Sequence, residues 1–173
     1  DQIDLDYLFV VAGGNPALFD NKAVFNWLGR MSRFGARLGG VSGGPVILAS
    51  AGLMGDRRMT VHWEHAEALA EISPHLLIER TLYVMDRDRL TCAGGTAALD
   101  LMLNLVAIQH GHELAAAVAD QLLHERIRDH RDQQRVALPA RLGVRHPKLL
   151  AAIKAMEENL EEPLTRSELA EMA

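Results

Sequence analysis

The sequence lacks multiple cysteines, long apolar runs and an excess of basic residues, and each absence excludes a class of protein. The single cysteine, Cys92, excludes an intramolecular disulfide framework and suits a reducing cytoplasm. No apolar run approaches the roughly 20 residues of a membrane-spanning helix, and no signal peptide is visible. With 18 basic against 23 acidic residues, the net charge of −5 argues against a surface that grips nucleic acid by itself.

What is present is the composition of an ordinary globular protein. Hydrophobic residues make up 49% of the 173 positions and charged residues 24%, which is enough for one domain with a real core. Basic residues gather between 126 and 145, but acidic residues are mixed among them. This mixture favours a solvated helix face over a binding patch.

Short apolar runs alternate with segments of helical spacing along most of the chain. We predict strands over 7–12, 38–41, 59–63, 76–78, 82–85 and 90–92, and helices over 21–34, 45–53, 64–72, 96–110 and 113–124. We interpret 126–142 as a helix and then a linker, 146–160 as a helix, and Thr165-x-x-Glu168 as a capping box. The alternation predicts an α/β fold with a doubly wound, mainly parallel sheet.

The turn after the second predicted strand places a serine among glycines. Gly40-Val41-Ser42-Gly43-Gly44 fits the pattern G-x-S-x-G, in which the serine has strained dihedral angles between a strand and a helix. The free N–H groups at the start of that helix favour an anion. The predicted strand 59–63 supplies His62, and a hydroxyl with a nearby imidazole can form a nucleophilic site.

Other turns are expected at the same carboxyl edge of the sheet. Gly13 and Gly14 follow the first predicted strand, and Cys92-Ala93-Gly94-Gly95 follows the last, so both can wall a pocket. Taken alone, Cys92 is most simply a small buried hydrophobe and His62 a packed strand-end residue. The run His62-Trp63-Glu64-His65 need not converge on a metal at a strand-to-helix junction, so we expect no metal and no cofactor.

Taken together, these motifs resemble a known family. The segments 13–15, 40–45, 60–63 and 91–103 resemble the flavodoxin-like PfpI superfamily, which is related to class I glutamine amidotransferases. More narrowly, segments 59–64, 91–97 and 163–165 resemble AraC-type transcription regulators that carry a PfpI-like amino-terminal sensor.

The resemblance implies a division of the chain. It suggests a sensor domain over 1–142 that is incomplete at its amino terminus, a linker helix over 143–162 and the start of a helix-turn-helix domain over 163–173. We therefore expect a piece of a longer, cytoplasmic and homodimeric regulator that binds a small-molecule effector. DNA binding would belong to the rest of the helix-turn-helix domain, with no DNA-binding residue in this piece and no membrane partner.

The resemblance also bears on catalysis. The superfamily's elbow usually holds a cysteine where this chain has Ser42, and its histidine lies about where His62 lies. Serine is a poor nucleophile unless an aligned base and a third group activate it, so we predict a non-catalytic sensor. The remaining pocket suits a carboxylate, and the Trp63 indole suits a quaternary or guanidinium group.

The predicted ligand is therefore a small amino-acid derivative. The predicted ligand-binding residues are Gly13, Gly14, Ser42, Gly43, His62, Trp63, Cys92 and Gly94. Two alternatives stay open: a serine-dependent hydrolase or amidase that uses Ser42 and His62, and a dimerisation scaffold with an empty pocket. The α/β-hydrolase version is disfavoured because its acid follows the serine before the histidine, and the 20 positions from Ser42 to His62 leave no room for this order.

Overall fold

The computed structural model describes residues 4–136, 138–144 and 146–172. It divides into two compact units, one that ends at Gln134 and one that begins at Arg135. The candidate site lies in the first unit.

A four-stranded sheet forms the centre of the first unit. Its order is β1 (Tyr7–Ala12), β2 (Arg37–Ser42), β6 (Arg89–Cys92) and β5 (Tyr83–Asp86). The first three strands are parallel, and β5 pairs with β6 in an antiparallel hairpin. Two further strands, β3 (Arg58–Met59) and β4 (Leu77–Ile78), pair in a small parallel sheet of their own. The mainly parallel sheet is thus confirmed.

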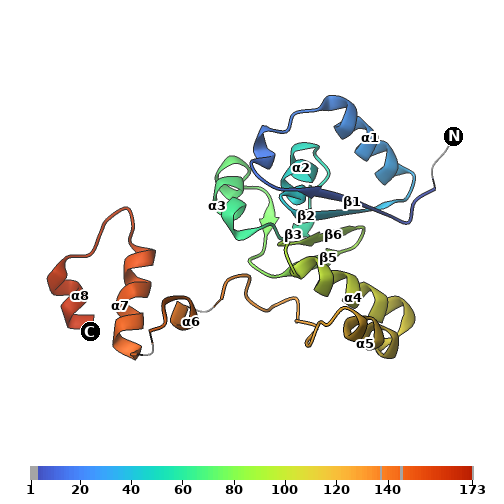
Figure 1. Cartoon of the computed structure of the whole chain (residues 1–173). Coiled ribbons are helices and arrows are strands. Elements are labelled where there is room, and N and C mark those ends of the chain that lie inside the picture. Colours follow the sequence, from blue (N-terminus) through green and yellow to red (C-terminus); the bar gives the residue numbers. More distant parts are fainter. Residues whose placement is uncertain (1–3, 137, 145, 173) are drawn as a thin grey trace. The chain divides into compact units, whose positions relative to one another are not determined.

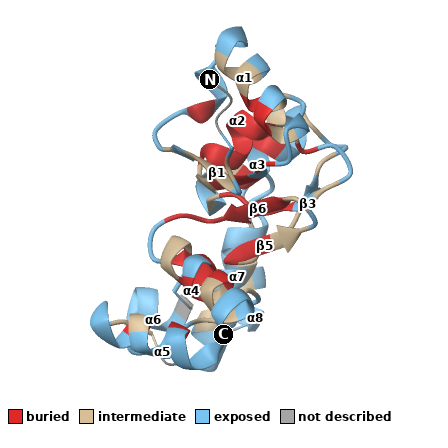
Figure 2. Cartoon of the chain, turned by 90° about the vertical axis from the view of Figure 1, so that its right-hand side faces the viewer, coloured by how far each residue is buried: buried red, intermediate tan, exposed pale blue. Residues whose placement is uncertain are grey.

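Helices cover both faces of the large sheet (Figure 1). The helices α1 (Lys22–Arg33) and α2 (Gly44–Ser50) lie on one side, and α4 (Ala97–His110) and α5 (His112–Gln121) lie on the other. Each face has its own hydrophobic cluster, because inward side chains alternate across a strand: Leu38 packs with α1 and α2, and Leu90 packs with α4. In Figure 2 the buried residues are concentrated in α2, α4 and the strands between them. The doubly wound arrangement is therefore confirmed.

Local signals set several element boundaries. The Asn21 side chain begins α1 by accepting hydrogen bonds from the amides of Ala23 and Val24 at 3.1 and 3.2 Å. Beyond β1, the 3-10 turn η1 (Pro16–Leu18) packs on α2, and α3 (Trp63–Ile72) connects the two strands of the small sheet. Gly111 separates α4 from α5 with a φ of 94°, a value that suits glycine.

The prediction of a strand over 59–63 is wrong beyond its first residue. The strand β3 ends at Met59, and Thr60 leaves the ladder because its amide donates to the Thr91 hydroxyl (2.9 Å). His62 is consequently the N-cap of α3 and is not carried on a strand.

The prediction of a helix followed by a linker over 126–142 is also wrong. The described residues from 122 to 136 form turns and irregular chain, and the short helix α6 (Leu138–Leu142) comes after them. This segment is held by long-range hydrogen bonds instead of the local hydrogen bonds of a helix. The amide of Arg128 donates to Asp100, and the amide of Leu82 donates to the carbonyl of His130.

The second unit is helical. It contains α6, α7 (Pro147–Glu158) and α8 (Arg166–Met172). The predicted capping box is present. The amide and the hydroxyl of Thr165 both donate to a Glu168 carboxylate oxygen at 2.8 Å, and the Glu168 amide donates to the Thr165 hydroxyl at 3.3 Å.

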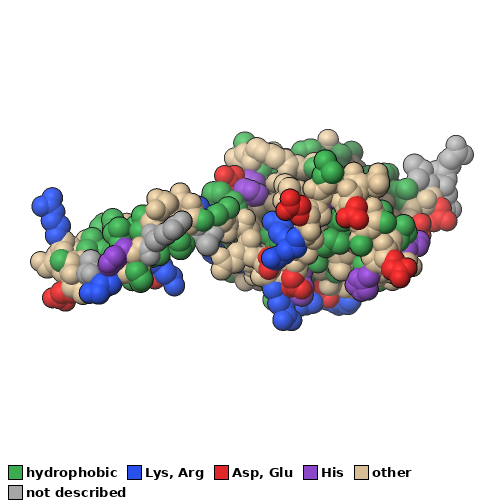
Figure 3. All heavy atoms as spheres, turned by 60° about the horizontal axis from the view of Figure 1, so that its bottom comes forward, with side chains coloured by type: hydrophobic (Ala, Val, Ile, Leu, Met, Phe, Trp, Pro, Cys, Tyr) green, Lys and Arg blue, Asp and Glu red, His purple; other side chains and the backbone are tan. Residues whose placement is uncertain are grey.

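No single charge dominates the one face of the molecule that is drawn with all its atoms. On the face that Figure 3 presents, acidic, basic and histidine side chains are interspersed among apolar and uncharged groups. Over the described stretches, none of the helices has the length and apolar character needed to cross a bilayer.

Candidate ligand site

Ser42 lies on a sharp turn between β2 and α2. Its φ of 60° is a left-handed conformation that a non-glycine residue rarely adopts. Two glycines allow neighbouring chain segments to approach closely at this turn. A Cβ on Gly44 would lie 1.9 Å from the carbonyl oxygen of Val10, and one on Gly94 would lie 2.5 Å from the Ser42 Cβ. The predicted strained elbow is therefore confirmed as a backbone feature.

His62 lies beside the elbow but is oriented by other groups. Its amide donates to the Ser42 carbonyl oxygen at 3.3 Å. Its Nδ1 accepts from the Glu64 amide at 3.4 Å and lies 3.6 Å from a Glu64 carboxylate oxygen. No hydrogen bond joins the Ser42 hydroxyl to His62 or to any other described residue, so the serine has no aligned base in this structure.

Cys92 lies beneath the elbow and is fully buried. Burial raises the pKa of its thiol, and this outweighs the opposite effect of the Gly94 and Ser42 amides that point at the sulfur. A neutral buried thiol behaves as a small hydrophobe, which agrees with the plainer interpretation of this residue.

A pocket opens next to the elbow at the carboxyl edge of the sheet. Its volume is about 190 Å³, below the roughly 300–1,000 Å³ of sites for drug-sized ligands, so it suits a metabolite of amino-acid size. Its wall comes from four regions: the start of α3, Leu82 just before β5, the turn that opens α4 and the segment after α5. The lining residues are His62, Trp63, Leu82, Ala93, Gly94, Gly95, Thr96, Ala97, Arg128 and Gln134.

The structure brings together some of the predicted site residues and not others. His62, Trp63 and Gly94 line this pocket, and Ser42 lies directly behind Gly94. The remaining predictions do not line it: Gly13 and Gly14 are exposed beyond β1, Gly43 packs against Pro16, and Cys92 lies underneath.

Sequence reasoning missed three polar residues of the pocket, namely Thr96, Arg128 and Gln134. The last two lie in the mixed-charge stretch that we interpreted as a solvated helix face. No local pattern could have singled them out, because their partners are 28 to 74 positions away in the sequence.

Asp100 holds Arg128 against the pocket wall. This aspartate is fully buried in the first turn of α4, and its oxygens accept from the Arg128 amide (2.9 Å), Nε (2.9 Å) and Nη2 (2.6 Å). Nε2 of His124 lies 2.8 Å from the same carboxylate. Burial raises the pKa of Asp100, but the hydrogen bonds from Arg128 and His124 outweigh it and leave the pKa below its ordinary value.

Gln134 also lines the pocket and is held there by several hydrogen bonds. Its Nε2 donates to the Thr81 carbonyl (2.8 Å), the Val61 carbonyl (3.1 Å) and the Thr60 hydroxyl (3.1 Å). Its Oε1 is buried and has no hydrogen-bond partner. The segment after α5 is thus tied down at both of its pocket-lining residues.

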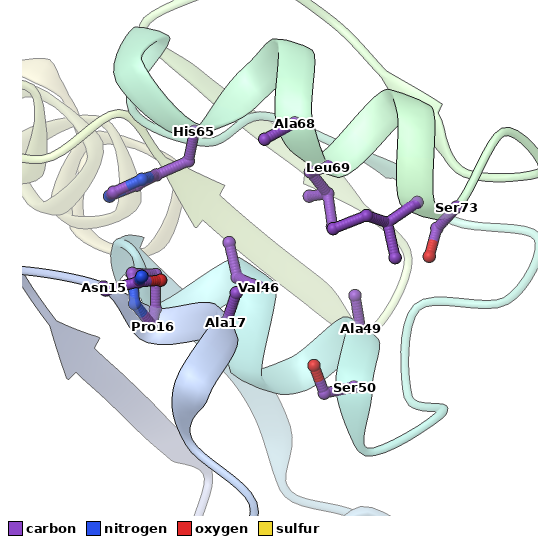
Figure 4. Close-up of a pocket in the computed structure, with 11 residues that line it drawn as sticks. Asn15, Pro16, Ala17, Val46, Ala49, Ser50, His65, Ala68, Leu69 and Ser73 are labelled. Atoms are coloured by element: carbon purple, nitrogen blue, oxygen red, sulfur yellow. The ribbon is translucent and has the colours of Figure 1, made fainter.

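A second pocket of about 190 Å³ lies between α2 and α3 (Figure 4). Ala68 and Leu69 of α3 face Val46 and Ala49 of α2, and Asn15 lies at one end. This pocket contains neither an arginine nor a lysine and does not include Ser42 or His62. We therefore place the candidate site in the pocket beside the elbow.

Metal binding has no support among the described residues, where no three His, Cys, Asp or Glu side chains are grouped to hold an ion. His62 and His65 contact each other through their rings at 6.0 Å, without a third ligand.

The comparisons with known proteins agree with this geometry. The model of the DJ-1/PfpI family matches residues 2–108, which is more than half of the chain. The chain belongs to the DJ-1/PfpI family. The resemblance to the PfpI superfamily that the sequence motifs indicated is therefore confirmed.

The curated relatives of this DJ-1/PfpI chain are HTH-type transcriptional regulators. It is 46% identical to the regulator CdhR of Pseudomonas aeruginosa over 96% of this chain and 49% of that protein. It is 42% identical to the regulator GlxA of Rhizobium meliloti over 96% of this chain and 52% of that protein. The chain thus spans about half the length of these relatives, and their names support a non-catalytic role for the domain.

Solved structures support the same assignment. The fold is similar to that of an AraC family transcriptional regulator from Pseudomonas putida, with a TM-score of 0.60 and 33% identity over 69% of this chain and 64% of that one. A DJ-1 superfamily protein from Salmonella typhimurium, at 22% identity and a TM-score of 0.55 over 68% of this chain and 65% of that one, shares the fold.

Proposed function

We propose that this chain is the ligand-sensing part of a bacterial AraC-type transcription regulator and binds a small amino-acid-derived metabolite. The observation that carries the proposal is the pocket beside the Ser42 elbow, lined by His62, Trp63 and Arg128, in a chain whose relatives are HTH-type regulators. Ser42 and His62, which would catalyse hydrolysis in an enzyme, would here lie beside the ligand without reacting with it.

The chemistry of the pocket supports a zwitterionic ligand. Arg128 and the first turn of α4 favour a carboxylate, because both present N–H donors and positive charge. Trp63, whose exposed fraction is 42%, offers an aromatic face to a guanidinium or quaternary ammonium group.

The second unit supports a link to DNA binding. We expect α7 to belong to the linker (143–162) and the capped helix α8 to begin the helix-turn-helix domain (163–173), within a regulator that acts as a homodimer in the cytoplasm. Ligand binding in the pocket would then change the affinity of the helix-turn-helix domain for DNA, because the ligand site and the DNA site would be energetically coupled.

Calorimetric titration of the intact protein with arginine, glycine betaine and carnitine tests the proposal. We expect at least one of them to bind and to change the affinity for DNA of the protein's own promoter region. The Trp63→Ala variant should weaken the binding of a cationic ligand about 5- to 10-fold, as the loss of a cation–π contact would. Phe34→Ala removes an exposed aromatic that lies at the end of α1 and should leave binding unchanged.

Two results would contradict the proposal. One is the absence of binding by every compound of this panel to folded protein. The other is hydrolysis of an ester or amide probe that disappears in Ser42→Ala, since this would favour an enzyme.

A further inference from the structure

The last segment of the first unit carries an arginine whose surroundings suggest a specific role. Arg128 lines the candidate pocket, and 29% of its side chain is exposed. The lining contains no aspartate or glutamate, so Arg128 is its one permanently charged side chain among the described residues. A positive group beside the start of the 14-residue helix α4 creates a site that favours anions.

The hydrogen bonds of the Arg128 guanidinium leave one nitrogen for a ligand. Of its five N–H donors, the Nε donor goes to Asp100 (2.9 Å), and those of Nη2 go to Asp100 (2.6 Å) and to the Thr96 hydroxyl (2.7 Å). Nη1, with two donors, makes no hydrogen bond to the described residues. Because Asp100 and Thr96 fix the plane of the guanidinium, little further ordering is needed when Nη1 binds a partner.

Arg128 also differs from Arg126, one of the two other arginines in the same segment. Arg126 is 71% exposed and pairs on the surface with Asp132, whose side chain is 34% exposed. A surface pair of this kind contributes little to stability or recognition. The fully buried Asp100 places Arg128, whereas nothing comparable places Arg126.

On the basis of the proposed function, we infer that Arg128 binds the carboxylate of the ligand through Nη1, with Asp100 and Thr96 as its positioning residues. The ligand class is therefore narrowed to metabolites with a free carboxylate. The contact falls on the segment that ends the first unit at Gln134, so a bound ligand stabilises this segment directly.

Matched ligands test the inference without any mutation. Arginine is compared with argininamide, glycine betaine with choline, and carnitine with its methyl ester, each by calorimetry on the intact protein. For a compound that binds, removal of the carboxylate charge should weaken binding about 10- to 100-fold, the effect of losing hydrogen bonds to a charged group.

A matched set of variants locates the effect at Arg128. Arg128→Gln alone leaves the Asp100 charge buried without its partner, so the test variant combines Arg128→Gln with Asp100→Asn. It should bind the carboxylate form about 10- to 100-fold more weakly and should no longer distinguish it from the analogue that lacks the carboxylate charge. Arg126→Gln is the control and should retain the wild-type preference.

Hydrogen exchange gives an independent readout that needs no variant. A ligand on Arg128 should slow amide exchange in residues 124–134 and at Leu82, whose amide donates to the carbonyl of His130 (2.8 Å).

The outcomes separate the two proposals. Equal binding of a compound and its analogue without the carboxylate charge, or wild-type binding by the double variant, would overturn the role of Arg128 while leaving a ligand-binding sensor intact. Binding of no compound to the wild-type protein would overturn the sensor proposal and this inference with it.

Discussion

At the scale of single residues, the turn that opens α4 packs closely against the Ser42 elbow at the end of β2, because Gly94 has no side chain. Gly94 has a φ of 89°, and a Cβ there would lie 2.5 Å from the Cβ of Ser42. Gly95 has a φ of 54° with open space around it. A side chain at Gly95 would therefore meet only the cost of a left-handed conformation. A side chain at Gly94 would meet that cost and a clash with Ser42 as well.

This contrast gives the first prediction. Gly94→Ala should lower the free energy of unfolding by about 3 kcal/mol, because an unfavourable φ and a clash combine. Gly95→Ala should lower it by about 1 kcal/mol, the cost of a left-handed conformation alone. Urea unfolding of both variants provides the measurement, and equal losses would show that the clash with Ser42 is relieved by a small shift.

At the scale of elements, Asp100 is the link between α4 and the irregular segment after α5. It accepts hydrogen bonds from Arg128 and lies 2.8 Å from Nε2 of His124, so it replaces the regular hydrogen bonds that this segment lacks. Loss of its charge should loosen the segment while the sheet stays formed.

The second prediction concerns the charge of Asp100 and its pH dependence. Asp100→Asn should lower the free energy of unfolding by about 3 kcal/mol at pH 7, because Arg128 loses its buried partner. The pKa of Asp100 is lowered in the folded state, so its contribution is complete above the ordinary value of 3.8 and is lost as the pH falls through the lowered pKa.

Unfolding measured from pH 7 down to pH 3 tests this sign. The difference between wild type and Asp100→Asn should shrink only below about pH 4. Asp120→Asn, at an exposed position on α5, should match the wild type throughout. A difference that grows as the pH falls would contradict the assignment of a lowered pKa.

The third prediction tests the start of α1. Asn21→Ala should cost about 1 kcal/mol, because the amides of Ala23 and Val24 lose their side-chain acceptor. Asn21→Ser restores an acceptor and should recover most of the loss. Thermal unfolding measures both, and an unchanged midpoint in Asn21→Ala would mean that water satisfies the two amides equally well.

The elements also show what the sequence could predict. Runs such as Tyr7–Ala12 and caps such as Asn21 act over a few residues, so their strand and helix were predictable. The end of β3 at Met59 was not, because the hydroxyl that takes the next amide belongs to Thr91, far along the chain. The role of Arg128 was hidden for the same reason, since Asp100 lies 28 positions away.

At the scale of the whole molecule, the first unit depends on two hydrophobic clusters, one on each face of the sheet. Leu48 of α2 belongs to one cluster and Leu101 of α4 to the other, and neither side chain reaches solvent. The sheet is a single layer shared by both clusters, so loss of either should unfold the same cooperative unit.

The last prediction follows from this arrangement. Leu48→Ala and Leu101→Ala should each lower the free energy of unfolding by about 3 kcal/mol, the usual cost of a cavity left by a buried leucine. Because the sheet separates the two sites, the losses should add to within about 0.5 kcal/mol in the double variant. Urea unfolding followed by both circular dichroism and tryptophan fluorescence should give one transition for each protein. Two separate transitions would mean that the two faces of the sheet unfold independently. A double variant that loses much less free energy of unfolding than the sum of the two single losses would mean that the sheet transmits strain between the faces.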